Sequence, residues 1–186
     1  MKKLLSAVAV IAVVGFAASS VWAVTPVRSV GFEAGYVSPD LTGVESSGTW
    51  VGGVFADFGL PAANLTVNPF INYWSWSESA NSFDTSFRDV SVGANLKYAF
   101  PTASVKFQPF IAGGLGIHLL NASVEGSDPL LGSYSLDQGD TKIGFQGGAG
   151  FKVGVSQNAN LITSGWYNVV DNANNWSLRA GMAWSL

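Results

Sequence analysis

The chain has 186 residues, of which 48% are hydrophobic, 13% aromatic and only 11% charged, and it contains no cysteine. The lack of cysteine excludes a small secreted fold held together by disulfides, and a formal net charge of −3 gives no indication of nucleic-acid binding. The length is that of one domain, whose stability must come from apolar packing or from closure of a sheet.

The N-terminal segment has the pattern of a signal peptide. Two lysines precede an apolar run over residues 4–18, and the small residue Ala23 follows a short polar stretch. The run is shorter than the roughly 20 residues that a membrane-spanning helix needs. We therefore predict cleavage after Ala23, with residues 1–23 as the signal peptide and residues 24–186 as the single folded domain. Without its two N-terminal lysines this domain has seven basic and twelve acidic residues.

Eight segments of the exported chain alternate with period two, as strands with two different faces do. In chain order they are residues 28–38, 49–60, 65–76, 87–100, 105–119, 141–155, 161–170 and 176–186. In nearly every segment one face is bulky and apolar, and the other is rich in Gly, Ser, Asn and Ala with scattered charges. The seventh segment leaves its two faces undecided.

The connections between these segments differ in length. Short ones are predicted at residues 61–64, 101–104 and 156–160, and longer ones at 39–48, 77–86 and 121–140, with a tighter fourth at 171–175. Short turns at one end and long loops at the other are typical of an outer-membrane barrel. We predict an all-β fold: a closed, antiparallel, eight-stranded transmembrane β-barrel with up-and-down meander connections and both termini at the periplasmic end.

Aromatic residues on the apolar face favour a membrane barrel over a soluble one, because they fall at two levels, as bilayer interfaces require. The level near the long loops contains Tyr36, Trp50, Tyr73 and Trp176. The level near the short turns contains Phe58, Tyr98, Phe100, Phe107, Phe151 and Trp184. These ten residues form the predicted lipid-interface girdles.

The sequence resembles a known superfamily in several features. These are the signal peptide, the eight alternating segments, the stretch PFIAGGLG from Pro109 to Gly116, and the alternating end Trp184-Ser185-Leu186. Together they resemble the small outer-membrane β-barrel superfamily, which includes OmpA-like membrane domains and the OmpW, OmpX and opacity-protein types. No signature assigns a subfamily. Such chains usually end in an aromatic residue that the barrel-assembly machinery reads, whereas this one ends in Leu186.

The resemblance implies a set of surroundings and partners. It implies location in a bacterial outer membrane, contact with outer-membrane lipid and lipopolysaccharide, and the barrel-assembly machinery as a partner during biogenesis. We expect a monomer with no nucleic-acid partner and no cofactor.

His118 is the first candidate for chemistry. The stretch GIHLLNAS from Gly116 to Ser123 faintly resembles lipid A deacylases, eight-stranded barrels in which a serine acts as nucleophile and a histidine as base. Leu120 occupies the serine position, and only His118 and Asn121 match. The alternation also directs His118 into the lumen, away from lipid. We therefore predict no catalytic residue and place His118 in a polar network inside the barrel.

Charged residues on the small face form a predicted lumen charge network. Together with His118, its members are Glu33, Asp57, Lys97, Lys106, Lys152 and Arg179. Asp57, Lys97, Lys106 and Lys152 are expected near the periplasmic mouth, and Glu33 and Arg179 are expected to pair higher in the lumen, with His118 at its top. Eight strands leave room only for well-fitted side chains, and buried charges must be paired, so we favour a plugged lumen. The alternative is a narrow, anion-preferring channel.

Ten of the twelve acidic residues are predicted to lie in or beside the long loops: Asp40, Glu45, Glu78, Asp84, Asp89, Glu125, Asp128, Asp137, Asp140 and Asp171. Their spacing matches no calcium-binding loop, so we predict a solvated outer surface and no metal site. The expected role is structural or in surface contact. The alternatives are a narrow channel for small solutes or ions and, less favoured, a lipid A-modifying enzyme.

Overall fold

The computed structural model describes residues 26–41, 47–80, 83–103, 106–128 and 132–186. The predicted signal peptide and Glu45 lie outside these residues, and so does the side chain of Asp128. The described part of the chain contains no helix with the length and apolar character needed to cross a membrane.

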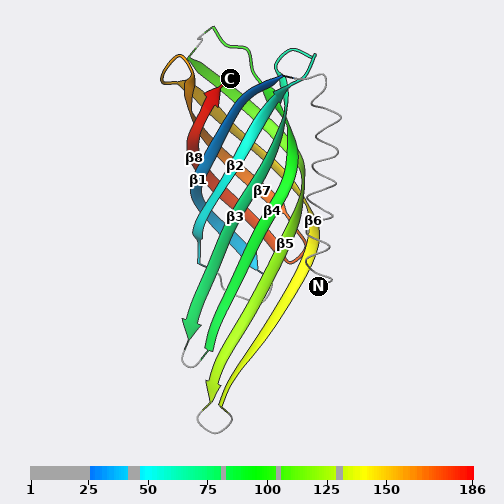
Figure 1. The fold of residues 1–186 in the computed structure, drawn as a ribbon, viewed down its shortest axis with the longest axis vertical. Coiled ribbons are helices and arrows are strands. Elements are labelled where there is room, and N and C mark those ends of the chain that lie inside the picture. The colour runs from blue at the N-terminus through cyan, green and yellow to red at the C-terminus, as the bar shows by residue number, and fades with distance from the viewer. Residues whose placement is uncertain (1–25, 42–46, 81–82, 104–105, 129–131) are drawn as a thin grey trace.

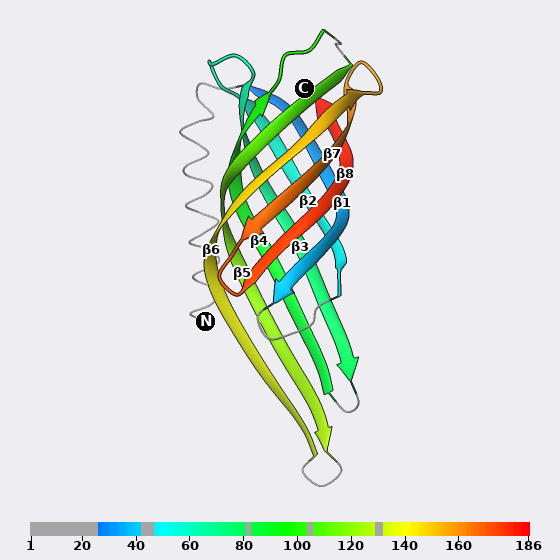
Figure 2. The same cartoon turned by 180° about the vertical axis from the view of Figure 1, so that it is seen from behind.

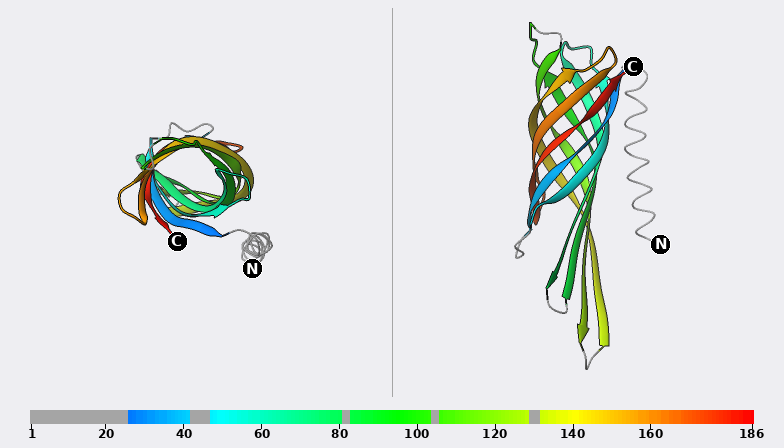
Figure 3. Two further views of the ribbon diagram at one scale, coloured as in Figure 1. Left: turned by 90° about the horizontal axis from the view of Figure 1, so that it is seen from above. Right: turned by 90° about the vertical axis from the view of Figure 1, so that its left-hand side faces the viewer.

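Eight strands form the described structure. They are β1 (Val27–Leu41), β2 (Thr49–Gly59), β3 (Leu65–Ala80), β4 (Phe83–Ala99), β5 (Phe107–Asp128), β6 (Gly132–Gly154), β7 (Ala159–Val169) and β8 (Ala173–Ser185). Each strand pairs antiparallel with the next, and β1 pairs with β8 to close the barrel (Figures 1 and 2). Seen from above, the strands form a closed ring (Figure 3). The predicted fold class is confirmed.

The two ends of the barrel differ in shape. The short turns and the end of β8 lie at one end, which is the periplasmic end in barrels of this kind. At the opposite end the β3–β4 and β5–β6 hairpins extend far beyond the other strands (Figures 1 and 3). The long loops predicted at 77–86 and 121–140 are therefore wrong, since most of these residues continue the strands. Large apolar side chains such as Val124 and Leu136 are sparse on these extensions, so the extensions lack the regular apolar alternation that marks a strand in lipid. Their backbones nevertheless stay hydrogen-bonded to one another.

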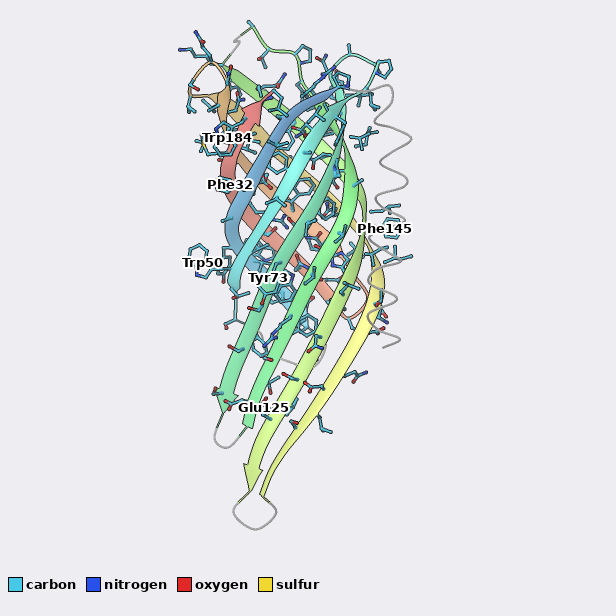
Figure 4. All side chains as sticks on the ribbon, viewed as in Figure 1. Phe32, Trp50, Tyr73, Glu125, Phe145 and Trp184 are labelled. Carbon is cyan, nitrogen blue, oxygen red and sulfur yellow. The ribbon has the colours of Figure 1, made fainter. Side chains whose placement is uncertain are left out.

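The alternation of faces is as the sequence predicts. Side chains such as Phe32, Ile71 and Leu115 are exposed on the outside of the barrel, and their neighbours along each strand point inward. Figure 4 shows Trp50 projecting away from the barrel wall. The undecided seventh strand is resolved, because Ser164 and its even-numbered neighbours are buried inside. An eight-stranded barrel with an apolar exterior is thus complete.

Candidate functional site: the lumen and the extracellular sheet

The predicted girdle residues mostly lie on the outer surface. All four at the long-loop level are exposed, and the Tyr36 and Trp176 rings lie 5.9 Å apart. At the short-turn level Tyr98 is half-buried, and only Phe58 is buried, with 5% of its surface exposed. Phe58 pairs with Val27 beside a register shift in β1, a local irregularity that strict alternation along β2 cannot foresee. The contact of the other aromatic residues with membrane interfaces stays a prediction.

Asp57 anchors the periplasmic half of the lumen. The Ser29 hydroxyl donates to Asp57 Oδ2 at 2.9 Å, and Asn68 Nδ2 donates to Oδ1 at 2.8 Å. Lys97 Nζ lies 2.5 Å from Oδ1 in a salt bridge that is largely buried. These partners come from β1, β3 and β4, so the group ties β2 to both of its neighbouring strands and to β4.

Amide side chains continue this network across the barrel. Asn95 donates to Asn68 at 3.3 Å, and Gln146 donates to Asn95 at 2.6 Å. The ammonium group of Lys97 also lies over two aromatic rings, 5.5 Å from the centre of Phe55 and 5.2 Å from that of Phe110. Such contacts stabilise a cation that has left bulk water.

Glu33 and Arg179 lie at the middle of the lumen, where their opposite charges attract each other. Glu33 accepts a hydrogen bond from Ser164 at 3.0 Å, and Arg179 Nε donates to Ser177 at 3.0 Å. Among the described residues no salt bridge joins the two. Both line a central cavity of about 20 Å³. That volume is close to the space for one water molecule, so the centre of the lumen is almost filled.

His118 and Asp89 form a buried pair in the extracellular half. His118 Nδ1 lies 2.9 Å from Asp89 Oδ2, and Trp74 Nε1 donates to the same oxygen at 3.0 Å. The other carboxylate oxygen of Asp89 is buried without a partner among the described residues. The prediction of Asp89 as a surface acid is therefore wrong. The prediction placed Asp89 among the loop acids. Asp89 lies two residues before the buried Ser91 on the same strand, however, so alternation directs both side chains inward.

Apolar side chains surround this pair and close the extracellular half of the lumen. The apolar seal consists of Val37, Leu41, Val51, Trp74, Trp76, Leu120, Val170 and Ala173, which are all buried. Phe87 packs against it, with its ring 5.3 Å from that of Trp74. The sequence prediction missed this cluster, although the alternation did direct Trp74 inward. The signal was the presence of large apolar residues at inward positions of a face taken as small and polar.

The periplasmic end of the lumen contains open space. A cavity of about 300 Å³ and a second of about 250 Å³ share Gln108, Lys152 and Ser185 in their linings. We call the two together the periplasmic vestibule. The first also contacts Lys106 and the second Lys97, so the predicted cluster of lysines at this mouth is present.

Four strands continue beyond the barrel and form an extracellular sheet. It comprises residues 75–80, 83–88, 121–128 and 132–140 of β3 to β6. Asp84 and Glu125 are cross-strand partners with exposed side chains, and Figure 4 shows Glu125 well beyond the barrel. Neighbouring Ser86 and Ser123 hydroxyls share a hydrogen bond of 2.7 Å. The sheet is therefore ordered by both backbone and side-chain hydrogen bonds.

Lys142 lies at the extracellular rim, where β6 has not yet paired with β7. Its Nζ is 3.1 Å from Asp140 and 2.8 Å from Asp171, and both carboxylates are more than half exposed. The hydrogen bond from Lys142 lowers the pKa of Asp140, and the hydrogen bond to Asp171 raises the pKa of Lys142. In the described part of the chain no three acidic or histidine side chains converge closely enough to hold a metal ion.

The whole chain can now be compared with known proteins. A family model for the outer membrane protein beta-barrel domain matches residues 6–184. The chain belongs to this family. It lies in the bacterial outer membrane, as the family and the exposed apolar band of the barrel require. A search of curated protein sequences finds no match.

Solved structures share this fold at low identity. Neisserial surface protein A (NspA) is 22% identical with a TM-score of 0.65, covering 85% of this chain and 96% of that one. Ail, the attachment invasion locus protein of Yersinia pestis, is 14% identical with a TM-score of 0.56 over 86% and 99%. The outer membrane enzyme PagL is 17% identical with a TM-score of 0.53 over 85% and 99%. This group includes surface proteins and an enzyme, so the shared fold does not decide between these roles.

Proposed function

We propose that this protein is a closed, non-catalytic outer-membrane barrel that presents its extracellular sheet as a surface for contact. The observation that carries the proposal is the contrast between a lumen packed with apolar side chains in its extracellular half and a sheet of four strands projecting beyond it. A barrel whose extracellular half is closed by packed Trp, Val and Leu side chains has no continuous water path. What remains available to the outside of the cell is the extracellular sheet.

The names of two similar proteins support this role. NspA is named as a surface protein and Ail as an attachment invasion locus protein. The extracellular sheet of this chain adds its own support, because Asp84, Glu125 and Asp137 are exposed on it. On a hydrogen-bonded sheet these carboxylates are held at fixed positions relative to one another, which a flexible loop would not provide.

The enzyme alternative has one supporting contact, the pair of His118 and Asp89. However, His118 is only 4% exposed and points into the lumen, where an acyl chain in the membrane cannot reach it. Leu120 belongs to the apolar seal, and Ser123 bonds to Ser86 in the extracellular sheet. The arrangement therefore fits a structural hydrogen-bonded pair better than a base beside a nucleophile.

Conductance across a planar bilayer tests the closed lumen. We expect the refolded chain to give no discrete current steps, and a variant with Lys97, Lys106 and Lys152 changed to Gln to be equally silent. Steps from a demonstrably folded wild-type chain would establish a channel instead.

Shortening the hairpins tests the contact surface. Residues 78–85 and 123–137 can each be replaced by Asn-Gly, which forms a two-residue hairpin turn at positions that remain paired. The shortened barrel should fold, and cells that carry it should adhere less than wild-type cells to surfaces coated with extracellular-matrix protein. A control keeps both hairpins and changes Asp84, Glu125 and Asp137 to the matching amides, which separates charge from shape. Equal adhesion by all three forms would remove the contact role.

A further inference from the structure

The periplasmic vestibule has an excess of positive charge. Four cationic side chains line it, namely Arg28, Lys97, Lys106 and Lys152, and Asp57 is its one acidic side chain among the described residues. Asp57 is already neutralised by Lys97 at 2.5 Å and accepts two further hydrogen bonds. Arg28 and Lys152 therefore create a positive potential in a space with low-dielectric walls, where such a potential is focused.

Neutral donors complete the lining. Gln108, Asn64 and Asn160 supply amide groups, and Ser185 supplies a hydroxyl. The hydroxyl of Thr66 lies in the same lining and is buried with no hydrogen-bond partner among the described residues. A buried hydroxyl without a partner carries an unfavourable desolvation cost, which a bound acceptor oxygen would relieve.

The vestibule ends inside the barrel. Phe110 and Ile162 are buried above it, and the Lys97 ammonium lies against the rings of Phe55 and Phe110. Beyond them the central cavity holds only about 20 Å³, and the apolar seal follows. A molecule that enters from the periplasm therefore stays at the mouth and does not pass through.

We propose that the periplasmic vestibule is a binding site for a phosphate group. Lys152 and Arg28 would hold its charge, and the amide and hydroxyl donors would bind its remaining oxygens, because charge-assisted hydrogen bonds to phosphate are strong. Two sources share this chemistry: a free phosphate ester in the periplasm and the headgroup of an inner-leaflet phospholipid at the rim. The inference goes beyond the proposed surface role and does not depend on it.

Titration with inorganic phosphate tests the site. The chain, refolded in neutral-detergent micelles and labelled with ¹⁵N, is titrated at constant ionic strength with chloride as the reference anion. We expect saturable shifts in the side-chain amide signals of Gln108 and Asn160. The double variant R28Q/K152Q should weaken binding by roughly tenfold or more, because it removes two charge-assisted contacts.

Lys142→Gln is the matched control, since it removes one cation from the opposite end of the same lumen. It should leave phosphate binding unchanged, and gel mobility before and after heating shows that each variant is folded. The same spectra in nanodiscs with phosphatidylglycerol or with phosphatidylcholine alone distinguish the sources. Phosphatidylcholine also carries a phosphate group but no net charge. Larger shifts at Gln108 and Asn160 with phosphatidylglycerol than with phosphatidylcholine therefore assign an anionic lipid headgroup, whereas saturable shifts with free phosphate in micelles assign a soluble ester. No saturable shift from either source, or equal weakening by K142Q, would overturn the proposal.

Discussion

The two halves of the lumen are built by the same eight strands but are filled in opposite ways. The extracellular half is closed by the apolar seal, in which Trp74 and Trp76 contribute the largest side chains. The periplasmic half keeps its charges, centred on Asp57 and Lys97, beside open space of about 250 to 300 Å³. One end is packed with apolar side chains and the other contains cavities.

The difference teaches how a narrow barrel accommodates polar groups. Charges near the periplasmic mouth stay close to water, so their desolvation cost is limited. Asp89 lies farther from the mouth, within the seal, and there Trp74 and His118 both bond to it. Polar groups deep in the lumen are thus bound by neighbouring side chains, whereas Arg28 and Lys152 at the mouth border open space.

Removal of a tryptophan from the seal should have the largest effect. Trp74→Ala leaves a cavity and removes one donor from buried Asp89, so we expect a loss of about 3–5 kcal/mol in the free energy of unfolding. Urea titration of the refolded barrel in micelles, followed by gel mobility, measures it. The control is Trp50→Ala on the outer surface, where 78% of the side chain is exposed. Equal losses from the two variants would mean that the seal does not stabilise the barrel.

Breaking the ion pair at the vestibule should cost less. Asp57→Ala leaves Lys97 largely buried without its carboxylate, and water in the vestibule limits the loss to about 3 kcal/mol, the lower end for buried pairs. Urea titration of Asp57→Ala, Lys97→Met and the double variant gives the coupling free energy. The double variant should recover part of the stability, because it leaves no unpaired charge. Additive losses would show that the two side chains act independently.

Two adjacent glycines of β6 test which face of the strand points into the lumen, with a smaller expected effect on stability. At Gly148 a Cβ would lie 2.6 Å from the carbonyl oxygen of Gly165 and from the Trp166 ring, whereas at Gly147 it would meet nothing within 4 Å. We expect Gly148→Ala to lower the free energy of unfolding by about 1–3 kcal/mol through overpacking. Gly147→Ala should change it little, and the same urea titration compares them. A larger loss at Gly147 would contradict the assignment of faces.

The fold could be predicted from the sequence because lipid imposes alternation on every membrane-spanning strand. The same alternation placed Asp57, Lys97 and His118 inside the barrel correctly. It failed beyond the membrane, where residues 77–80, 83–86, 121–128 and 132–140 contain few large apolar side chains and yet form strands. Alternation records the environment of a side chain, and a strand in water on both sides has only one environment.

The contacts inside the lumen could not be predicted, because they join strands that are distant in the sequence. The seal combines Val37, Val51, Leu120 and Val170 with Trp74, and only the register of the closed sheet brings these together. For the same reason the sequence could not show that Glu33 and Arg179 attract each other without a direct salt bridge. Each side chain has a serine within reach, and strand order alone does not reveal which partner is nearer.

Lys142→Gln should have the smallest effect, although Lys142 contacts two carboxylates. Asp140 and Asp171 are largely exposed, and water and salt screen such pairs. The lowered pKa of Asp140 means that its contribution is present above the pKa of the unfolded chain and is lost as the pH falls through the folded value. The raised pKa of Lys142 gives a contribution that is lost only at strongly alkaline pH. Urea titrations should therefore show a small difference in the free energy of unfolding between wild type and variant at neutral pH. The difference should vanish in acid and also at high salt. A gap that persists in high salt would mean that this rim is shielded from water, as the seal below it is, and that the water-excluding half of the lumen extends to the cell surface.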